Sequence, residues 1–147
     1  MTRTLLIDNY DSFTSNLYHL ILAVNGCAPT VIPNDARDWH PDILQQFDNI
    51  VISPGPGRPD DDRDFGICRD AILQNIVPVL GICLGHQGIC HLHGGHVDLA
   101  IHARHGRYSR ITHDGTGLFE HIPSPFTAVR YHSLAVDRLP ETLVATA

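Results

Sequence analysis

Residues 79–87 join an apolar run to a helix-compatible segment through a Gly-x-Cys-x-Gly turn, with Cys83 at its centre. A strand-to-helix turn of this kind, a nucleophile elbow, presents one side chain at the top of a sheet. Gly81 and Gly85 fit because such a turn leaves no room for Cβ atoms and can demand a positive φ. The N–H groups and dipole at a helix start favour a thiolate over a thiol. We therefore expect Cys83 to be a nucleophile.

The composition is that of an acidic globular chain. Its 147 residues, of which 43% are hydrophobic, suit one domain. The net charge of −6 argues against a nucleic-acid or anionic-membrane partner, and no apolar run approaches the ~18 residues of a membrane span. The N-terminus lacks a signal-peptide pattern. Irregularly spaced cysteines do not indicate a disulfide framework, so we expect a reducing, cytoplasmic setting. Three of them are expected to be buried, inert thiols: Cys27, Cys68 and Cys90.

Short apolar runs predict the strands of a parallel sheet. They lie at residues 4–8, 29–33 (around Val31 and Ile32), 49–53 and 77–82. The third shows no polar alternation, and strands that are apolar throughout are typical of a parallel sheet covered on both faces. Helical patterns between them complete an α/β, flavodoxin-like, doubly wound sheet.

Three helical segments are expected between these strands. The first ends at Gly26 and carries an apolar stripe at i, i+3, i+4 and i+7: Leu17, Leu20, Ile21 and Val24. A helical turn is expected at residues 41–46. A further helix has one apolar face: Phe65, Cys68, Ile72 and Ile76.

The pattern changes after Gly95. Residues 97–111 predict a β-rich excursion with a turn at 105–107, and residues 126–131 predict a strand that ends at 132–134. The last residues, 143–147, form an apolar, strand-like run without a turn signal, so we expect the fold to be C-terminally incomplete.

Two polar clusters contain side chains of the kinds that bind metal ions. His91, His93 and His96 match no common zinc spacing, so a solvated helix end is the simpler interpretation. The acidic run at 60–62 is most simply the charged start of the next helix. We expect neither a metal nor a cofactor.

The loop at residues 54–57 and Cys83 each follow a predicted strand. Ligand sites in such sheets lie beyond the carboxyl ends of the strands, so both should face one pocket. Taken alone, the loop could be only a rigid turn. His86 is more simply a helix-surface residue than a catalytic base.

Four segments resemble, in order, the class I glutamine amidotransferase family. They are residues 8–14 (DNYDSFT), 53–57 (SPGPG), 81–87 (GICLGHQ) and 131–134 (YHSL), so residues 1–147 are expected to form one such domain. The first segment is similar to the glutaminase components of anthranilate synthase and aminodeoxychorismate synthase. The resemblance implies hydrolysis of L-glutamine to supply ammonia to a chorismate-using synthase, as a separate subunit or a fused domain.

The resemblance also implies roles for residues. The Cys83 thiolate attacks the amide carbon of glutamine, a γ-glutamyl thioester forms as ammonia leaves, and water releases glutamate. The N–H groups of Gly57 and Leu84 form the oxyanion hole. The implied substrate-binding residues are Gly55, Pro56, Gly57, Gln87, Ser133 and Leu134, of which the last two resemble the segment that holds the amino-acid end of glutamine.

The sequence departs from the family in one respect. The family's thiol works with a downstream His-Pro-Glu sequence, but the only His-Pro here is His40-Pro41, which is followed by Asp42 and precedes the elbow. We therefore expect an amidotransferase domain truncated before that segment. An alternative is a catalytically incomplete module that binds glutamine or the synthase. A third hypothesis is an unrelated thiol hydrolase with His132 or His86 as base.

Overall fold

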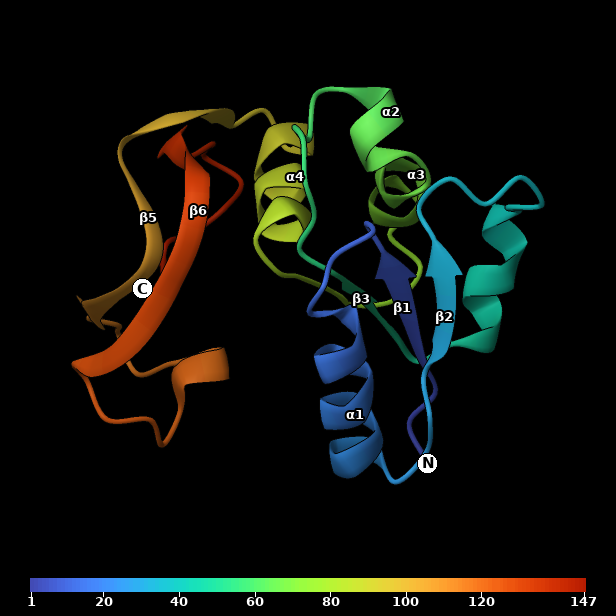
Figure 1. Ribbon diagram of the computed structural model, residues 1–147. Helices are drawn as coiled ribbons and strands as arrows, with labels where there is room; N and C mark the ends of the chain where they lie inside the picture. Colours follow the sequence, from blue (N-terminus) through green and yellow to red (C-terminus); the bar gives the residue numbers. More distant parts are fainter. The chain divides into compact units, whose positions relative to one another are not determined.

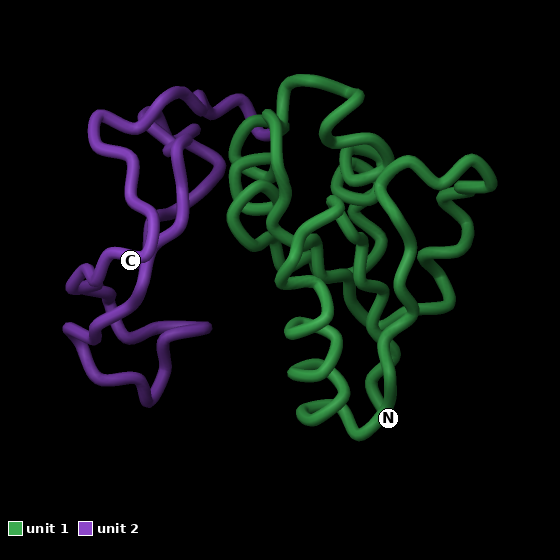
Figure 2. Tube along the Cα trace, viewed as in Figure 1, with its two compact units in different colours: residues 1–92 green, residues 93–147 purple.

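Two sheets organise the chain, which the computed structural model describes over all residues, 1–147. The first unit, Met1–Leu92, holds a four-stranded sheet, and the second unit, His93–Ala147, holds a two-stranded one (Figure 2). The expectation of one domain over residues 1–147 stays a prediction.

The first sheet is parallel, as its uninterrupted apolar strands predict. Its order is β2-β1-β3-β4, of which Figure 1 labels the first three. The strands are β1 (Thr4–Asp8), β2 (Thr30–Pro33), β3 (Asn49–Ile52) and β4 (Val79–Gly81). Every pairing in it is parallel. β1 has its predicted bounds, whereas β4 is shorter than the predicted strand. The carboxyl ends of β1, β3 and β4 therefore lie at one edge of the sheet.

The core of the first unit packs on one face of this sheet. Alternate strand residues contribute Leu5, Ile7, Ile50 and Ile52, each at most 1% exposed. The same cluster includes residues of the 3-10 helix η1 (Pro41–Gln46), of α3 (Cys68–Leu73) and of α4 (Leu84–Leu92). The helix that follows Cys83 is thus fixed by apolar packing against the strands.

Helix α1 (Thr14–Asn25) ends as predicted at Gly26, whose φ is +70° and whose N–H donates to the Leu22 carbonyl at 2.9 Å. Its apolar stripe is only partly buried, because Leu20 and Val24 are exposed. The other two members of the stripe, Leu17 and Ile21, are half-buried, so only this part of the helix face is covered.

The single helix expected after the acidic run is instead two helices, α2 (Asp62–Phe65) and α3. Gly66 separates them with a φ of +46°, and a Cβ there would overlap the Asn34 carbonyl oxygen. Phe65 and Cys68 are buried as predicted, but Ile76 lies beyond the end of α3 and is exposed. A tertiary contact, invisible in the periodicity, breaks the helix.

In the second unit, β5 (His96–Ile111) pairs antiparallel with β6 (Phe126–Arg138). The predicted turn at 105–107 is wrong, since β5 continues through it with a β-bulge at Gly106, where φ is +66°. β6 runs on through residues 132–134 instead of ending there. Residues 143–147 are irregular, and the Thr146 carbonyl accepts the Asp114 N–H at 2.9 Å. The short helix η2 (Gly117–Phe119) precedes β6.

Candidate active site

The turn at Cys83 has the backbone of a nucleophile elbow. Cys83 lies between β4 and α4 with a φ of +52°, a left-handed conformation that is uncommon for a side chain with a Cβ. The prediction that both flanking glycines leave no room for a Cβ is confirmed. A Cβ at Gly81 would lie 2.6 Å from the His86 nitrogen, and one at Gly85 would lie 2.7 Å from the Ile52 oxygen. The strained residue is the cysteine itself.

The electrostatics of the thiol differ from the sequence-based expectation. Burial raises the pKa of Cys83, a hydrogen bond from the Leu84 N–H lowers it, and the Asp11 carboxylate raises it further. The pKa lies above the ordinary value, so the expected bias toward thiolate from the helix start is present in the Leu84 contact but is outweighed. Desolvation of the half-buried sulfur outweighs the one favourable amide contact.

The glycine loop at residues 54–57 follows β3 and lies against the start of α4. A Cβ at Gly55 would lie 3.1 Å from Leu84 Cδ2 and 2.7 Å from the Asn9 oxygen. Pro56 and Gly57 are exposed, and Gly57 has a φ of +88°. The ends of β1, β3 and β4 therefore converge here, with Gly55 and Leu84 in contact.

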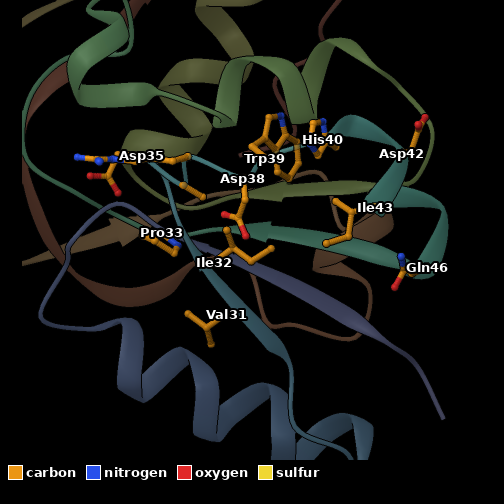
Figure 3. Close-up of a pocket in the computed structure, with 12 residues that line it drawn as sticks. Val31, Ile32, Pro33, Asp35, Asp38, Trp39, His40, Asp42, Ile43 and Gln46 are labelled. Atoms are coloured by element: carbon orange, nitrogen blue, oxygen red, sulfur yellow. The ribbon is translucent and has the colours of Figure 1, made fainter.

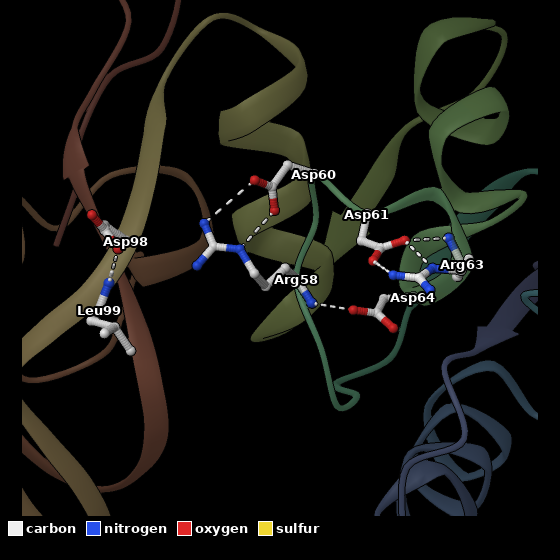
Figure 4. A network of polar contacts seen from close by, with 7 residues as sticks. All are labelled: Arg58, Asp60, Asp61, Arg63, Asp64, Asp98 and Leu99. Atoms are coloured by element: carbon white, nitrogen blue, oxygen red, sulfur yellow. Dashed lines mark hydrogen bonds and ion pairs between the residues drawn. The ribbon is translucent and has the colours of Figure 1, made fainter.

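The amide groups of this loop differ in availability. The Arg58 N–H donates to Asp64 Oδ2 at 2.9 Å (Figure 4). The Gly57 N–H donates to no group of the chain. Leu84 directs its N–H toward Cys83. One backbone donor thus contacts the thiol, and a second, exposed and unused, belongs to the loop whose Gly55 packs on Leu84. Backbone donors of this kind can stabilise an oxyanion that forms on a bound carbonyl.

The other predicted residues differ in their surroundings. Gln87 lies one turn after Cys83, its side chain is buried and its N–H donates to the Cys83 carbonyl at 2.9 Å. Ser133 and Leu134 belong to β6 of the second unit, where Ser133 Oγ lies 3.1 Å from His105 Nε2. Their role in holding glutamine stays a prediction.

His86, weighed earlier as a base, is an exposed residue of α4, and desolvation by neighbouring atoms lowers its pKa. Of the other cysteines, Cys68 and Cys90 are buried as predicted, whereas Cys27 is only half-buried and its thiol donates to the Thr2 carbonyl.

The carboxylates of the acidic run at residues 60–62 are paired with arginines. Each carboxylate forms an ion pair (Figure 4 shows the first two): Asp60 with Arg58 at 2.9 Å, Asp61 with Arg63 at 2.6 Å and Asp62 with Arg69 at 3.1 Å. The hydrogen bonds from Arg63 lower the pKa of Asp61 to about 2. No group of three or more His, Cys, Asp or Glu side chains is placed to hold a metal ion.

A cavity of about 770 Å³ lies elsewhere in the first unit, between the end of β2 and η1 (Figure 3). Its lining mixes apolar side chains such as Ile32 and Ile43 with Asp35, Asp38 and Trp39, whose indole N–H is buried without a partner. Sequence reasoning did not find it. It shares no residue with the glycine loop or the elbow.

The elbow and glycine loop stand in a chain whose residues 5–147 match the family model for glutamine amidotransferase class-I. The chain belongs to the class I glutamine amidotransferase family. An aminodeoxychorismate synthase from Streptomyces griseus is 56% identical over 145 residues, which are 99% of this chain and 20% of that protein. An anthranilate synthase component 2 from Methanothermobacter marburgensis is 43% identical over 152 residues, covering 97% of this chain and 76% of that protein.

The fold agrees with the family. The solved structure of a glutamine amidotransferase from Thermotoga maritima has a TM-score of 0.73 and 17% identity, and the match covers 95% of this chain and 64% of that one. It supports the flavodoxin-like architecture alone. The chain spans about a fifth of the length of the aminodeoxychorismate synthases that it resembles. None of its helices has the length and apolar character of a membrane span.

Proposed function

We propose that this chain is the glutaminase portion of an aminodeoxychorismate or anthranilate synthase, and that Cys83 is the nucleophile that attacks the side-chain amide of L-glutamine. The observation that carries the proposal is the convergence of two features at one sheet edge. A cysteine with a φ of +52° starts α4, and the unused Gly57 N–H belongs to the loop that touches Leu84.

The chemistry follows from this arrangement. The Cys83 sulfur attacks the amide carbon of glutamine, and the amide oxygen becomes an oxyanion that accepts hydrogen bonds from the N–H groups of Gly57 and Leu84. When the tetrahedral intermediate collapses, the carbon–nitrogen bond breaks, the nitrogen takes a proton and leaves as ammonia, and a γ-glutamyl thioester remains. Water then hydrolyses the thioester to glutamate and the free thiol.

The same proposal assigns substrate contacts from the family resemblance. Gly55, Pro56 and Gln87 are assigned to the amide of glutamine, and Ser133 and Leu134 are assigned to its amino-acid end. The proposal names no histidine of this chain as the base.

Within the proposal, ammonia goes to a chorismate-using synthase, present as a subunit or as a further part of one chain. The relatives support this partner because they carry the names of such synthases. Within the proposal, the protein acts in the reducing cytoplasm, where a nucleophilic thiol stays free. All four cysteines of the chain are free.

The test is covalent labelling with a diazo-ketone analogue of glutamine, followed by mapping of the adduct by mass spectrometry. Labelling of Cys83 alone, suppressed by an excess of glutamine but not of glutamate, is the expected result. Cys27 provides an internal control, because it is a partly exposed thiol of the same chain outside the site. Labelling spread over all four cysteines, or unaffected by glutamine, would overturn the proposal.

A further inference from the structure

Three buried polar side chains, two amides and one hydroxyl, lie next to the glycine loop. Asn9 and Asn34 are 2% and 4% exposed, and Ser53 is fully buried. They come from the carboxyl ends of β1, β2 and β3 and are joined by hydrogen bonds, although none of them has a role in the proposed chemistry. Buried polar side chains that are fully hydrogen-bonded favour one rigid arrangement of the backbone they join.

Asn9 fixes the first half of the loop. Its Nδ2 donates to the Ser53 carbonyl at 2.9 Å, and its backbone N–H donates to Ser53 Oγ at 2.9 Å. Ser53 Oγ in turn donates to the Pro54 carbonyl at 2.6 Å. Gly55 packs so closely on Asn9 that a Cβ would lie 2.7 Å from the Asn9 oxygen. The loop cannot move toward β1 without displacing this side chain.

Asp64 fixes the second half. Its carboxylate accepts the Arg58 N–H at 2.9 Å and occupies the space into which a Gly57 Cβ would project. The contact therefore holds the peptide that follows Gly57. Together with the φ of +88° at Gly57, this contact constrains the residue whose N–H the proposed chemistry uses.

Asn34 connects the two halves through one amide. Its Nδ2 donates to Asn9 Oδ1 at 3.0 Å and to the Asp64 carbonyl at 2.7 Å, so both of its hydrogens are used. The backbone carbonyl of Asn34 accepts the Ile67 N–H at 2.8 Å. Cys68 supplies a second donor to Asn9 Oδ1 at 3.3 Å, and burial raises the pKa of that thiol to about 12, which keeps its proton in place.

We propose that Asn34 is a positioning residue, which through Asn9 and Asp64 holds the glycine loop in the geometry that the oxyanion hole needs. The inference rests on the proposed function, because it assigns the Gly57 N–H to the oxyanion. Asn34 touches neither Cys83 nor the loop itself in any hydrogen bond, so its effect passes through the Asn9 side chain and through the backbone of Asp64, whose carboxylate holds the Arg58 N–H.

The test compares two reactions of the same thiol. The nitrile analogue of glutamine, 2-amino-4-cyanobutanoate, forms a thioimidate: a carbon–sulfur bond forms, the carbon–nitrogen triple bond becomes a double bond, and the thiol proton moves to the nitrogen. That nitrogen occupies the oxyanion hole. Iodoacetamide alkylates the same sulfur by displacing iodide at a saturated carbon, so that no oxyanion develops.

Asn34→Ala is expected to lower the rate of thioimidate formation at Cys83 at least about 10-fold, since a misplaced donor loses most of its effect. Its iodoacetamide rate should stay within about twofold of the wild type. Asn25→Ala is the matched control, because it removes an asparagine whose Nδ2 donates to Thr4 Oγ1 at 2.8 Å, at the far end of α1. That variant should change neither rate.

Asp64→Ala keeps the proposal testable if Asn34→Ala does not fold, because Asp64 is only half-buried. It should show the same selective loss, and Asp64→Asn, which keeps an acceptor for the Arg58 N–H, should recover most of it. Equal losses in both reactions, or no loss in either, would overturn the positioning role. A wild-type chain that reacts with iodoacetamide but not with the nitrile would instead overturn the proposed glutaminase function.

Discussion

Gly85→Ala tests whether the position of the elbow depends on the contact between α4 and β3. A Cβ at residue 85 would lie 2.7 Å from the Ile52 oxygen and 2.9 Å from Ile52 Cγ2, whereas ordinary contact begins at 3.4 Å. The helix and the strand would have to separate by about 0.7 Å to bring the shorter contact from 2.7 to 3.4 Å. Because the nearest crowded atom is backbone and cannot rotate away, the upper part of the ~1–3 kcal/mol cost of overpacking applies, about 2–3 kcal/mol. The better helix propensity of alanine offsets ~1 kcal/mol of this cost.

The net expectation is a free energy of unfolding lower by ~1–2 kcal/mol, or a melting temperature lower by about 3–6 °C for a chain of this size. Because α4 begins next to Cys83, the same shift should slow labelling of Cys83 by the diazo-ketone analogue about 10-fold. Circular dichroism melting and mass spectrometry measure the two effects. Gly115→Ala is the control for the labelling. Nothing lies within 4 Å of its Cβ, so α4 should not shift and Cys83 should react at the wild-type rate, although a φ of +79° strains alanine there and lowers stability by itself. Wild-type stability and labelling in Gly85→Ala would refute the packing argument.

Three further changes have defined outcomes. Asp11→Asn removes a carboxylate that raises the pKa of Cys83, so the pH profile of iodoacetamide labelling should shift to lower pH and the rate at pH 7 should rise about twofold to fivefold; an upward shift would contradict this. Gly57→Ala combines a φ of +88° with a Cβ that overlaps Asp64, so reaction with the nitrile analogue should fall at least about 10-fold with little change toward iodoacetamide. Phe65→Ala empties a side-chain site that is 1% exposed, and urea unfolding should show a loss of ~3–5 kcal/mol; a loss below ~1 kcal/mol would contradict its place in the core.

The elements fixed by local pattern could be predicted from the sequence. β1 has its predicted bounds because its apolar residues and the polar turn after it agree. The elbow could be predicted because the Gly-x-Cys-x-Gly spacing around Cys83 is a local pattern. Gly81 is crowded within the same turn by Gly85 and His86, although Gly85 itself packs on Ile52 of β3. Helix α1 ends at Gly26 for the same local reason.

The predictions that failed concern features that depend on contacts between residues distant in sequence. The break between α2 and α3 comes from Gly66 packing on the Asn34 carbonyl, which no periodicity reveals. The raised pKa of Cys83 comes from burial and from Asp11 across the sheet edge. Asn34 itself stands in no motif, and a single asparagine after a short strand gives no signal that its amide joins two other segments.

Two effects can limit the reactivity of the site: the small thiolate population that a raised Cys83 pKa implies, and the stabilisation of the oxyanion by the glycine loop. Their relative size decides what makes the site reactive. Because burial is the largest cause of the raised Cys83 pKa, a bound glutamine that excludes more water would favour the thiolate even less. The rate must then come mainly from stabilising the oxyanion, so the loss in Gly57→Ala should exceed the gain in Asp11→Asn. Measured on the nitrile analogue at one pH, the two variants give this comparison directly. A larger effect from Asp11→Asn would mean that the thiolate population, and not the geometry of the glycine loop, limits the reaction.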